Sequence, residues 1–202
     1  ALSPPGRARV VGFPWGAFVW GANLGDRPQH AVGVAGLRFA PFEVTNQAYQ
    51  HYLQAHDADA PPGWDGAAFP PGQTAFQPVV NVTWAQAAAY CAAQGKRLPT
   101  EAEWEYACRG PENRSWPWGD EADPALANTL ENACGQAQTV GSYSPGGDSV
   151  FGVADLGGNV SEWVASKAAP YPYVDDGRNN PIDDGSPRAV RGGTFLGEQW
   201  QG

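Results

Sequence analysis

The chain has 202 residues, of which 42% are hydrophobic and 16% are charged, and this balance excludes an intrinsically disordered chain. Its formal net charge of −9 repels phosphate backbones, so we expect no nucleic-acid partner. No apolar run reaches the ~18 residues that a membrane-spanning helix needs, which predicts no membrane span.

The predicted elements begin with two short strands at residues 17–20 and 31–34, where β-branched and aromatic residues are frequent. The segment 25–28, Gly-Asp-Arg-Pro, is typical of a turn between them. Thr45 then predicts the start of a helix over residues 46–54. The apolar face of this helix is expected to carry Tyr49, Tyr52 and Leu53.

Two further helices are predicted by capping boxes, in which a threonine side chain and the side chain three residues later each bond the other residue's amide. The first box spans residues 83–86 and predicts a helix that ends near Ala93. The second spans 100–103 and predicts a helix that ends at Gly110. Two acidic residues in the first turn of this second helix suit the helix dipole.

The remaining segments are rich in Pro and Gly and lack helical periodicity. Residues 57–79 predict a long surface loop, and little helix is expected between 111 and 190. Within that region, residues 170–187 form a polar excursion, and 189–191 predict a strand. The whole pattern predicts an α+β fold in one domain, with short helices around small antiparallel sheets and long loops.

Cysteine and histidine show no metal-binding spacing. The three cysteines are Cys91, Cys108 and Cys134. Their odd number argues against a full disulfide framework, and we expect the first two to be small buried hydrophobic residues in helices. The histidines are His30, His51 and His56. Their spacing gives no support for a zinc or non-haem iron site.

Residues 95–107 (Gly-Lys-Arg-Leu-Pro-Thr-Glu-Ala-Glu-Trp-Glu-Tyr-Ala) are the most specific of a series of motif blocks. The other blocks are 25–30, 42–46, 79–84, 116–119, 127–128, 140–143, 157–163 and 190–193. In this order they resemble the formylglycine-generating-enzyme-like (sulfatase-modifying factor) family. The resemblance implies a C-type lectin fold and a single domain over residues 1–202. Related domains continue beyond the position of Gly202, so the C-terminal strands are expected to be incomplete.

In that family, two cysteines after the Gly-Gly pair bind copper and carry out the redox chemistry. The resemblance places them at Gly197 and Gly202, which have no thiol. We therefore predict that the protein is not an enzyme and expect no copper cofactor. The alternative is a formylglycine-generating-enzyme-like or sulfoxide-synthase-like oxidoreductase. The sulfoxide synthases do not need the cysteine pair, but they resemble a two-domain protein with an iron-binding helical partner.

The resemblance also implies a calcium site near the Gly-Asn-x-x-Glu-Trp loop. The matching positions are Asp155, Gly158, Val160 and Glu162. Two carboxylates and two backbone carbonyls are oxygen ligands of the kind that calcium prefers. The alternative is that Asp155 and Glu162 only bond backbone amides in a tight loop.

The segment 194–201 predicts a binding face. In a strand, one face of this segment carries Thr194, Leu196, Glu198 and Trp200. These four residues show no core pattern, and tryptophan is a common interface anchor. The arrangement resembles the variable proteins of diversity-generating retroelements. Those proteins have a C-type lectin fold and diversify alternating positions that start near an Arg-Gly-Gly motif.

We therefore predict a non-catalytic protein that binds a protein or cell-surface ligand through a variable recognition face. Display at a surface, or association with a phage, is the suspected setting, and a structural subunit of a phage or cell surface would share this role. The sequence specifies neither the ligand nor the oligomeric state.

Overall fold

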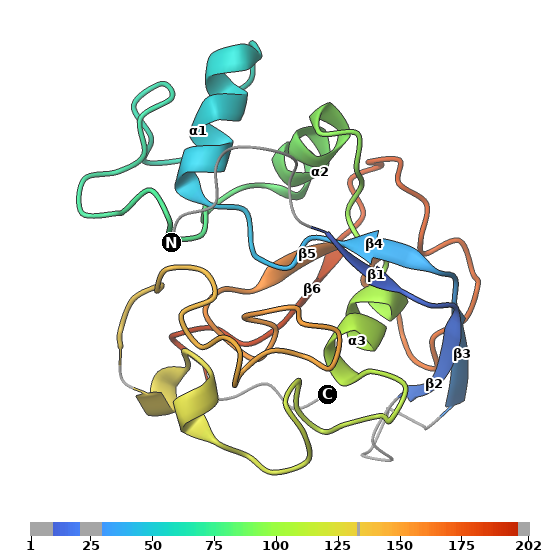
Figure 1. Ribbon diagram of the computed structural model, residues 1–202. Coiled ribbons are helices and arrows are strands. Elements are labelled where there is room, and N and C mark those ends of the chain that lie inside the picture. Colours follow the sequence, from blue (N-terminus) through green and yellow to red (C-terminus); the bar gives the residue numbers. More distant parts are fainter. Residues whose placement is uncertain (1–9, 21–29, 133, 198–202) are drawn as a thin grey trace.

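The computed structural model describes residues 10–20, 30–132 and 134–197 (Figure 1). The elements follow in the order β1 (Val11–Phe13), β2 (Gly16–Trp20), β3 (His30–Val34), β4 (Leu37–Phe39), α1 (Asn46–Ala55), α2 (Trp84–Ala93), α3 (Glu101–Arg109), the 3-10 helices η1 (Pro124–Leu126) and η2 (Leu130–Asn132), β5 (Glu162–Lys167) and β6 (Arg188–Arg191). Short helices and two-stranded antiparallel sheets joined by long loops make this an α+β fold, as predicted.

The first four strands form one bent β-ribbon. β1 pairs with β4 and β2 pairs with β3, both antiparallel. Phe13 faces Leu37 and Gly16 faces Val34, so the two pairs keep the same register across the break between them. Pro14 lies at that break, and its missing N–H cannot continue the hydrogen-bonded ladder.

The main hydrophobic core forms where α3 packs against this ribbon and against β5 and β6 (Figure 1). Trp104 and Tyr106 of α3 are 0% and 1% exposed, and they meet rings from the ribbon such as Phe13 and Phe18. Gly16 is required by this packing, because a Cβ there would lie 2.2 Å from the hydroxyl oxygen of Tyr106. Large rings therefore fill the centre of the fold.

A second aromatic cluster joins α1 and α2 away from the main core. Tyr49 and Tyr52 of α1 contact Tyr90 of α2, with ring centroids 5.5 and 5.4 Å apart. Trp64, from the loop after α1, closes the cluster at 5.8 Å from Tyr49. These rings give the long loop 57–79 an anchor.

Both predicted capping boxes are confirmed. The side chain of Thr83 accepts from the Gln86 amide and that of Thr100 from the Glu103 amide, with the reciprocal bonds present in each case. Arg97 supports the second box through two hydrogen bonds to the Glu103 carboxylate, at 2.6 and 2.7 Å.

Several elements differ from the prediction. β1, β4, η1, η2 and β5 were not expected. Trp163, expected in the core, is only half-buried, and its indole N–H donates to the Val82 carbonyl at 2.9 Å. None of the helices in the described ranges is long and apolar enough to span a membrane.

Candidate functional site

A groove with a volume of about 380 Å³ joins four segments that are far apart in the sequence. Its lining residues are Gly72, Gln73, Gln77, Pro78, Val80, Asn81, Gln136, Ala137, Val160, Ser161, Thr194, Phe195 and Leu196. Its size lies in the range of ligand-binding pockets, roughly 300–1,000 Å³. It brings together two residues of the predicted binding face, Thr194 and Leu196.

The end of the described chain forms a turn at the wall of this groove. The Gly197 amide donates to the Thr194 carbonyl at 3.0 Å, and the Leu196 amide donates to the Thr194 hydroxyl at 3.2 Å. Two main-chain bonds fix the turn from outside. Phe195 donates to the Asn159 carbonyl at 3.0 Å, and Leu130 donates to the Gly197 carbonyl at 2.9 Å.

The predicted strand over this segment is wrong for residues 194–197. β6 ends at Arg191, because Gly192 has a φ of 84° and leaves the extended region. Thr194 is half-buried and Leu196 is 69% exposed, and the consecutive residues 194–196 all line the groove. The expected alternation therefore does not hold there. Glu198 and Trp200, the other two residues of the predicted face, lie outside the described residues, as does Gly202.

Two Gly-Gly pairs hold the turn close to its support. A Cβ on Gly193 would lie 2.7 Å from the Gly157 carbonyl oxygen, and a Cβ on Gly158 would lie 2.6 Å from the Asn128 carbonyl oxygen. Real Cβ atoms do not approach backbone this closely, so both sites require glycine. The pairs 157–158 and 192–193 thus have a packing reason that is independent of any catalysis.

Asn159 links the groove segments through its side chain. It has a left-handed φ of 71° and is 1% exposed. Its Oδ1 accepts from Asn128 at 3.0 Å and from the Gln138 amide at 2.8 Å. Its Nδ2 donates to the Glu43 carboxylate at 2.6 Å. These bonds fix the segment around residue 136 and the loop before β5 in one arrangement.

The groove lining in the described part of the chain is polar but uncharged. Its side-chain amides belong to Gln73, Gln77, Asn81 and Gln136. Gln77 is already held by bonds to the Thr74 amide and the Ala137 carbonyl. The side-chain oxygen of Gln73, in contrast, is buried without a hydrogen-bond partner. Sequence reasoning did not identify these amides, because they come from loops without a recognisable pattern.

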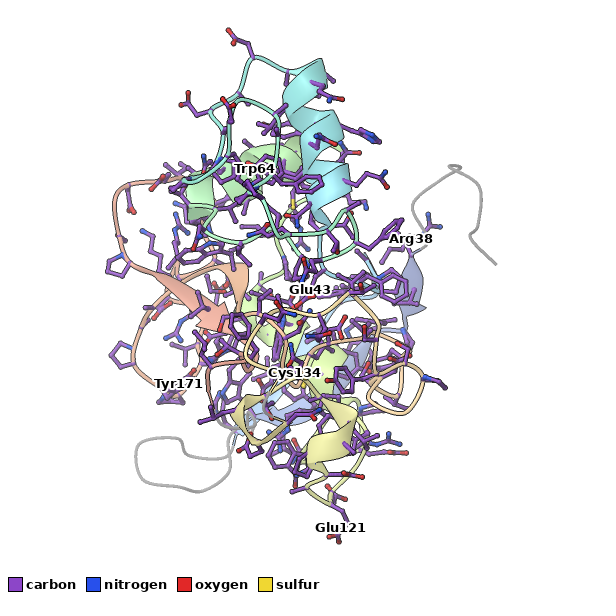
Figure 2. The ribbon with its side chains drawn as sticks, turned by 90° about the vertical axis from the view of Figure 1, so that its left-hand side faces the viewer. Arg38, Glu43, Trp64, Glu121, Cys134 and Tyr171 are labelled. Atoms are coloured by element: carbon purple, nitrogen blue, oxygen red, sulfur yellow. The ribbon has the colours of Figure 1, made fainter. Side chains whose placement is uncertain are left out.

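Three carboxylates lie in the interior beside this loop. Glu43 lies near the middle of the molecule in Figure 2, and its Oε1 accepts from the Val160 amide at 3.2 Å. Burial raises the pKa of Asp155 to about 6 and that of Glu162 to about 7. Burial, together with the negative charges of Asp155 and Glu162, also raises the pKa of Glu43 well above its usual range. The site therefore holds negative charge at a cost to stability.

The four predicted calcium ligands fit calcium in their donor chemistry. Asp155 bonds the Gly141 amide at 2.6 Å and Glu162 accepts from the Trp104 indole at 3.1 Å, so each carboxylate has one of the contacts that the alternative interpretation requires. The carbonyls of Gly158 and Val160 accept no main-chain hydrogen bond among the described residues. Within the same residues, no group of three or more His, Cys, Asp or Glu side chains is arranged to hold a metal ion. A calcium site here thus needs backbone oxygens.

The cysteines in the described ranges lie away from the groove lining. Cys108 is fully buried in α3, and burial raises the pKa of its thiol well above the usual value. Burial also raises the pKa of Cys91. A raised pKa keeps a thiol protonated and weakly nucleophilic, which is the property of a structural cysteine.

Residues 5–201 match the family described as the sulfatase-modifying factor enzyme 1-like domain. The chain is 40% identical to a formylglycine-generating enzyme of Mycobacterium tuberculosis, over 82% of this chain and 76% of that protein. It is 29% identical to a hercynine oxygenase of Mycolicibacterium smegmatis, over 96% of this chain and 56% of that protein. The chain thus spans little more than half the length of that hercynine oxygenase.

The fold is similar to that of a solved structure, Treponema denticola variable protein 1, with a TM-score of 0.68. The two share 22% identity, and the match covers 94% of this chain and 84% of the other. The predicted C-type lectin fold of the formylglycine-generating-enzyme-like type is therefore confirmed. The single-domain organisation and the incomplete C-terminal strands stay predictions.

Proposed function

The chain belongs to the sulfatase-modifying factor enzyme 1-like family, and we propose that within it this protein is a non-catalytic binding protein. The groove and the turn at 194–197 form the described part of its recognition face. The ligand is a protein or a cell-surface component, and the molecule works at a surface or as part of a phage. The resemblance to variable proteins and the shared fold support this proposal.

The observation that carries the proposal is the role of Gly197. It stands where the family resemblance places a catalytic cysteine, and its amide and carbonyl both hold the turn in place. It offers no side chain to a substrate. The groove beside it provides hydrogen bonds from amides and apolar contact from Leu196, which is the chemistry of recognition.

Calcium belongs to the same proposal as a structural ion. Asp155 and Glu162 would supply carboxylates and Gly158 and Val160 would supply carbonyls. When bound, the ion neutralises the negative charge that burial makes costly at these two acids. The residues themselves keep the loop before β5 in the shape that holds Asn159 and, through it, Phe195.

The alternative, an oxidoreductase, is favoured by the names of the relatives, a formylglycine-generating enzyme and a hercynine oxygenase. An activity assay separates the two. The protein is incubated with copper, oxygen and a cysteine-containing sulfatase peptide, or with iron(II), oxygen and hercynine, and the products are measured by mass spectrometry. The M. tuberculosis formylglycine-generating enzyme serves as the positive control in the first arm. We expect no product in either arm, and turnover in one of them overturns the proposal.

A further inference from the structure

One edge of the β2–β3 ribbon is unpaired. β3 forms its ladder with β2 alone, from His30 opposite Trp20 to Val34 opposite Gly16. In such a pair, the N–H and C=O groups of alternate residues point away from the partner strand. Among the described residues, no main-chain hydrogen bond joins residues 31–34 to any segment other than β2. An edge of this kind is a template for a further strand.

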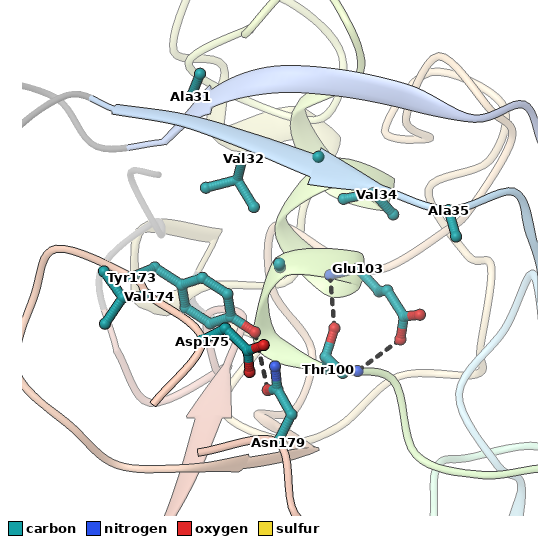
Figure 3. A pocket seen from close by; sticks show the side chains of 12 residues that line it. Ala31, Val32, Val34, Ala35, Thr100, Glu103, Tyr173, Val174, Asp175 and Asn179 are labelled. Carbon is teal, nitrogen blue, oxygen red and sulfur yellow. Dashed lines mark hydrogen bonds between the residues drawn. The ribbon is translucent and has the colours of Figure 1, made fainter. Parts of the chain in front are cut away.

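A pocket with a volume of about 340 Å³ runs along this edge (Figure 3). Five consecutive residues of the chain, 31–35, line it. Because successive side chains of a strand point to opposite faces, a run of consecutive lining residues means that the backbone edge itself borders the pocket. The opposite wall is the segment 173–175 with Asn179, and the first turn of α3 forms the third side. This pocket shares no lining residue with the groove of the recognition face.

The walls of the pocket are held in place. The Tyr173 ring stacks on Trp20 at 4.9 Å, and its hydroxyl donates to Asn179 at 2.8 Å. On the strand side, Val32 and Val34 are buried while residues 31 and 33 are exposed. A Cβ on Gly33 would meet nothing within 4 Å, so the outer face has open space beside the edge. An added strand would meet an apolar inner side and an open outer side.

The charge at the pocket is negative. Glu103 lines it, but its carboxylate is paired with Arg97. Asp175 is exposed and forms no hydrogen bond or ion pair among the described residues. With a chain net charge of −9, this carboxylate attracts cationic groups.

We propose that the edge of β3 binds an extended peptide segment of a partner protein by strand addition, with a lysine or arginine of the peptide placed against Asp175. Main-chain hydrogen bonds to β3 supply affinity, and alternate side chains supply specificity. Small apolar side chains of the peptide face Val32 and Tyr173, and basic side chains face outward. This surface lies outside the proposed recognition face and does not depend on it.

The probe is a fluorescently labelled, capped hexapeptide of alternating lysine and valine, and binding is followed by fluorescence anisotropy. One control peptide carries glutamate in place of lysine. A second keeps the lysines but has methylated backbone amides at every second position, which removes the donors of one edge. The protein variants are Asp175→Lys and, as a matched control with the same charge change outside the pocket, Asp183→Lys. Hydrogen exchange of the amides of residues 31–34 locates the binding.

We expect saturable binding of the lysine peptide, at least tenfold weaker binding of the methylated peptide, and protection of the β3 amides. Asp175→Lys should reverse the preference between the lysine and glutamate peptides, while Asp183→Lys leaves it in place. The proposal is overturned by a lack of saturable binding, by equal affinity of the methylated peptide, by an unchanged preference in Asp175→Lys, or by protection outside β3.

Discussion

The side-chain amide of Asn159 donates a hydrogen bond of 2.6 Å to the carboxylate of Glu43, which lies 116 residues earlier in the chain. Glu43 is removed from solvent, and its carboxylate also accepts from the Val160 amide. The pair joins the start of the chain to the loop that supports the recognition face. It is therefore the first place to test the architecture of the site.

Replacing Asn159 by alanine should lower the free energy of unfolding by about 3 kcal/mol, because it leaves buried hydrogen-bonding groups without partners. Chemical denaturation measures this change. The matched control is Asn81→Ala, since Asn81 also has a left-handed φ, of 62°, but is exposed. That control should lose only about 1 kcal/mol, from backbone conformation. Equal losses in the two variants would contradict the role assigned to the Asn159 side chain.

Without divalent ions, the protein should be less stable at pH 8 than at pH 5. The pKa values of Asp155 and Glu162 are raised from 3.8 and 4.5 to about 6 and about 7, so the folded state binds more protons than the unfolded state between these values. Stability is therefore fully present below about pH 4 as far as these groups are concerned, and it is lost as pH rises through 7. Each unit of raised pKa corresponds to about 1.4 kcal/mol.

Denaturation curves across this pH range measure the effect. Glu162→Gln should flatten the profile, because the amide cannot ionise. A steady rise of stability from pH 5 to pH 8 in the wild type would contradict the prediction.

Calcium should raise the melting temperature at pH 7.5, and chelation should reverse the rise. At a free calcium concentration about 100 times the dissociation constant, the expected gain is about 2.7 kcal/mol. Asp155→Asn should abolish the response. Asp183→Asn, the same change in an exposed loop, should retain it. A calcium response that survives in Asp155→Asn would place the ion elsewhere.

Gly158→Ala should destabilise the protein by more than about 2 kcal/mol, because its Cβ would lie 2.6 Å from the backbone oxygen of Asn128. Gly33→Ala is the matched control, since a Cβ at Gly33 meets nothing within 4 Å. That control should leave stability unchanged or slightly increased, because alanine costs less backbone entropy on folding. Thermal unfolding of the two variants decides the point.

Leu196→Ala should change stability by no more than about 0.5 kcal/mol, because the side chain is 69% exposed. Leu156→Ala removes the same atoms from a leucine that is 0% exposed and should cost about 2–5 kcal/mol. The same small effect is expected when Glu198 and Trp200 are replaced by alanine together with Leu196. A loss in the surface variants as large as that in Leu156→Ala would contradict a recognition role.

The parts of the fold that were predicted from the sequence have local causes. α2 and α3 follow from capping boxes, whose four residues contain the whole signal. β5 was missed because its residues belong to a motif block and carry no alternating pattern. The family match extends the prediction from these elements to the overall fold.

The site was predicted only in part, because its geometry depends on contacts between distant segments. Thr194 and Leu196 do line the groove, but the turn that presents them depends on bonds from Phe195 and Leu130 that a strand pattern cannot indicate. Glu43 lay in a motif block, and no local signal related its carboxylate to the loop before β5. The sequence thus identified the segment but not its conformation.

The recognition turn is attached to the rest of the molecule through backbone atoms, from Leu130 to Gly197 and from Phe195 to Asn159. Attachment of this kind does not depend on which side chain follows Thr194 in the sequence. A combinatorial library randomised at Leu196 should therefore yield folded clones at a high rate, and the protein offers a scaffold from which new affinity reagents can be selected.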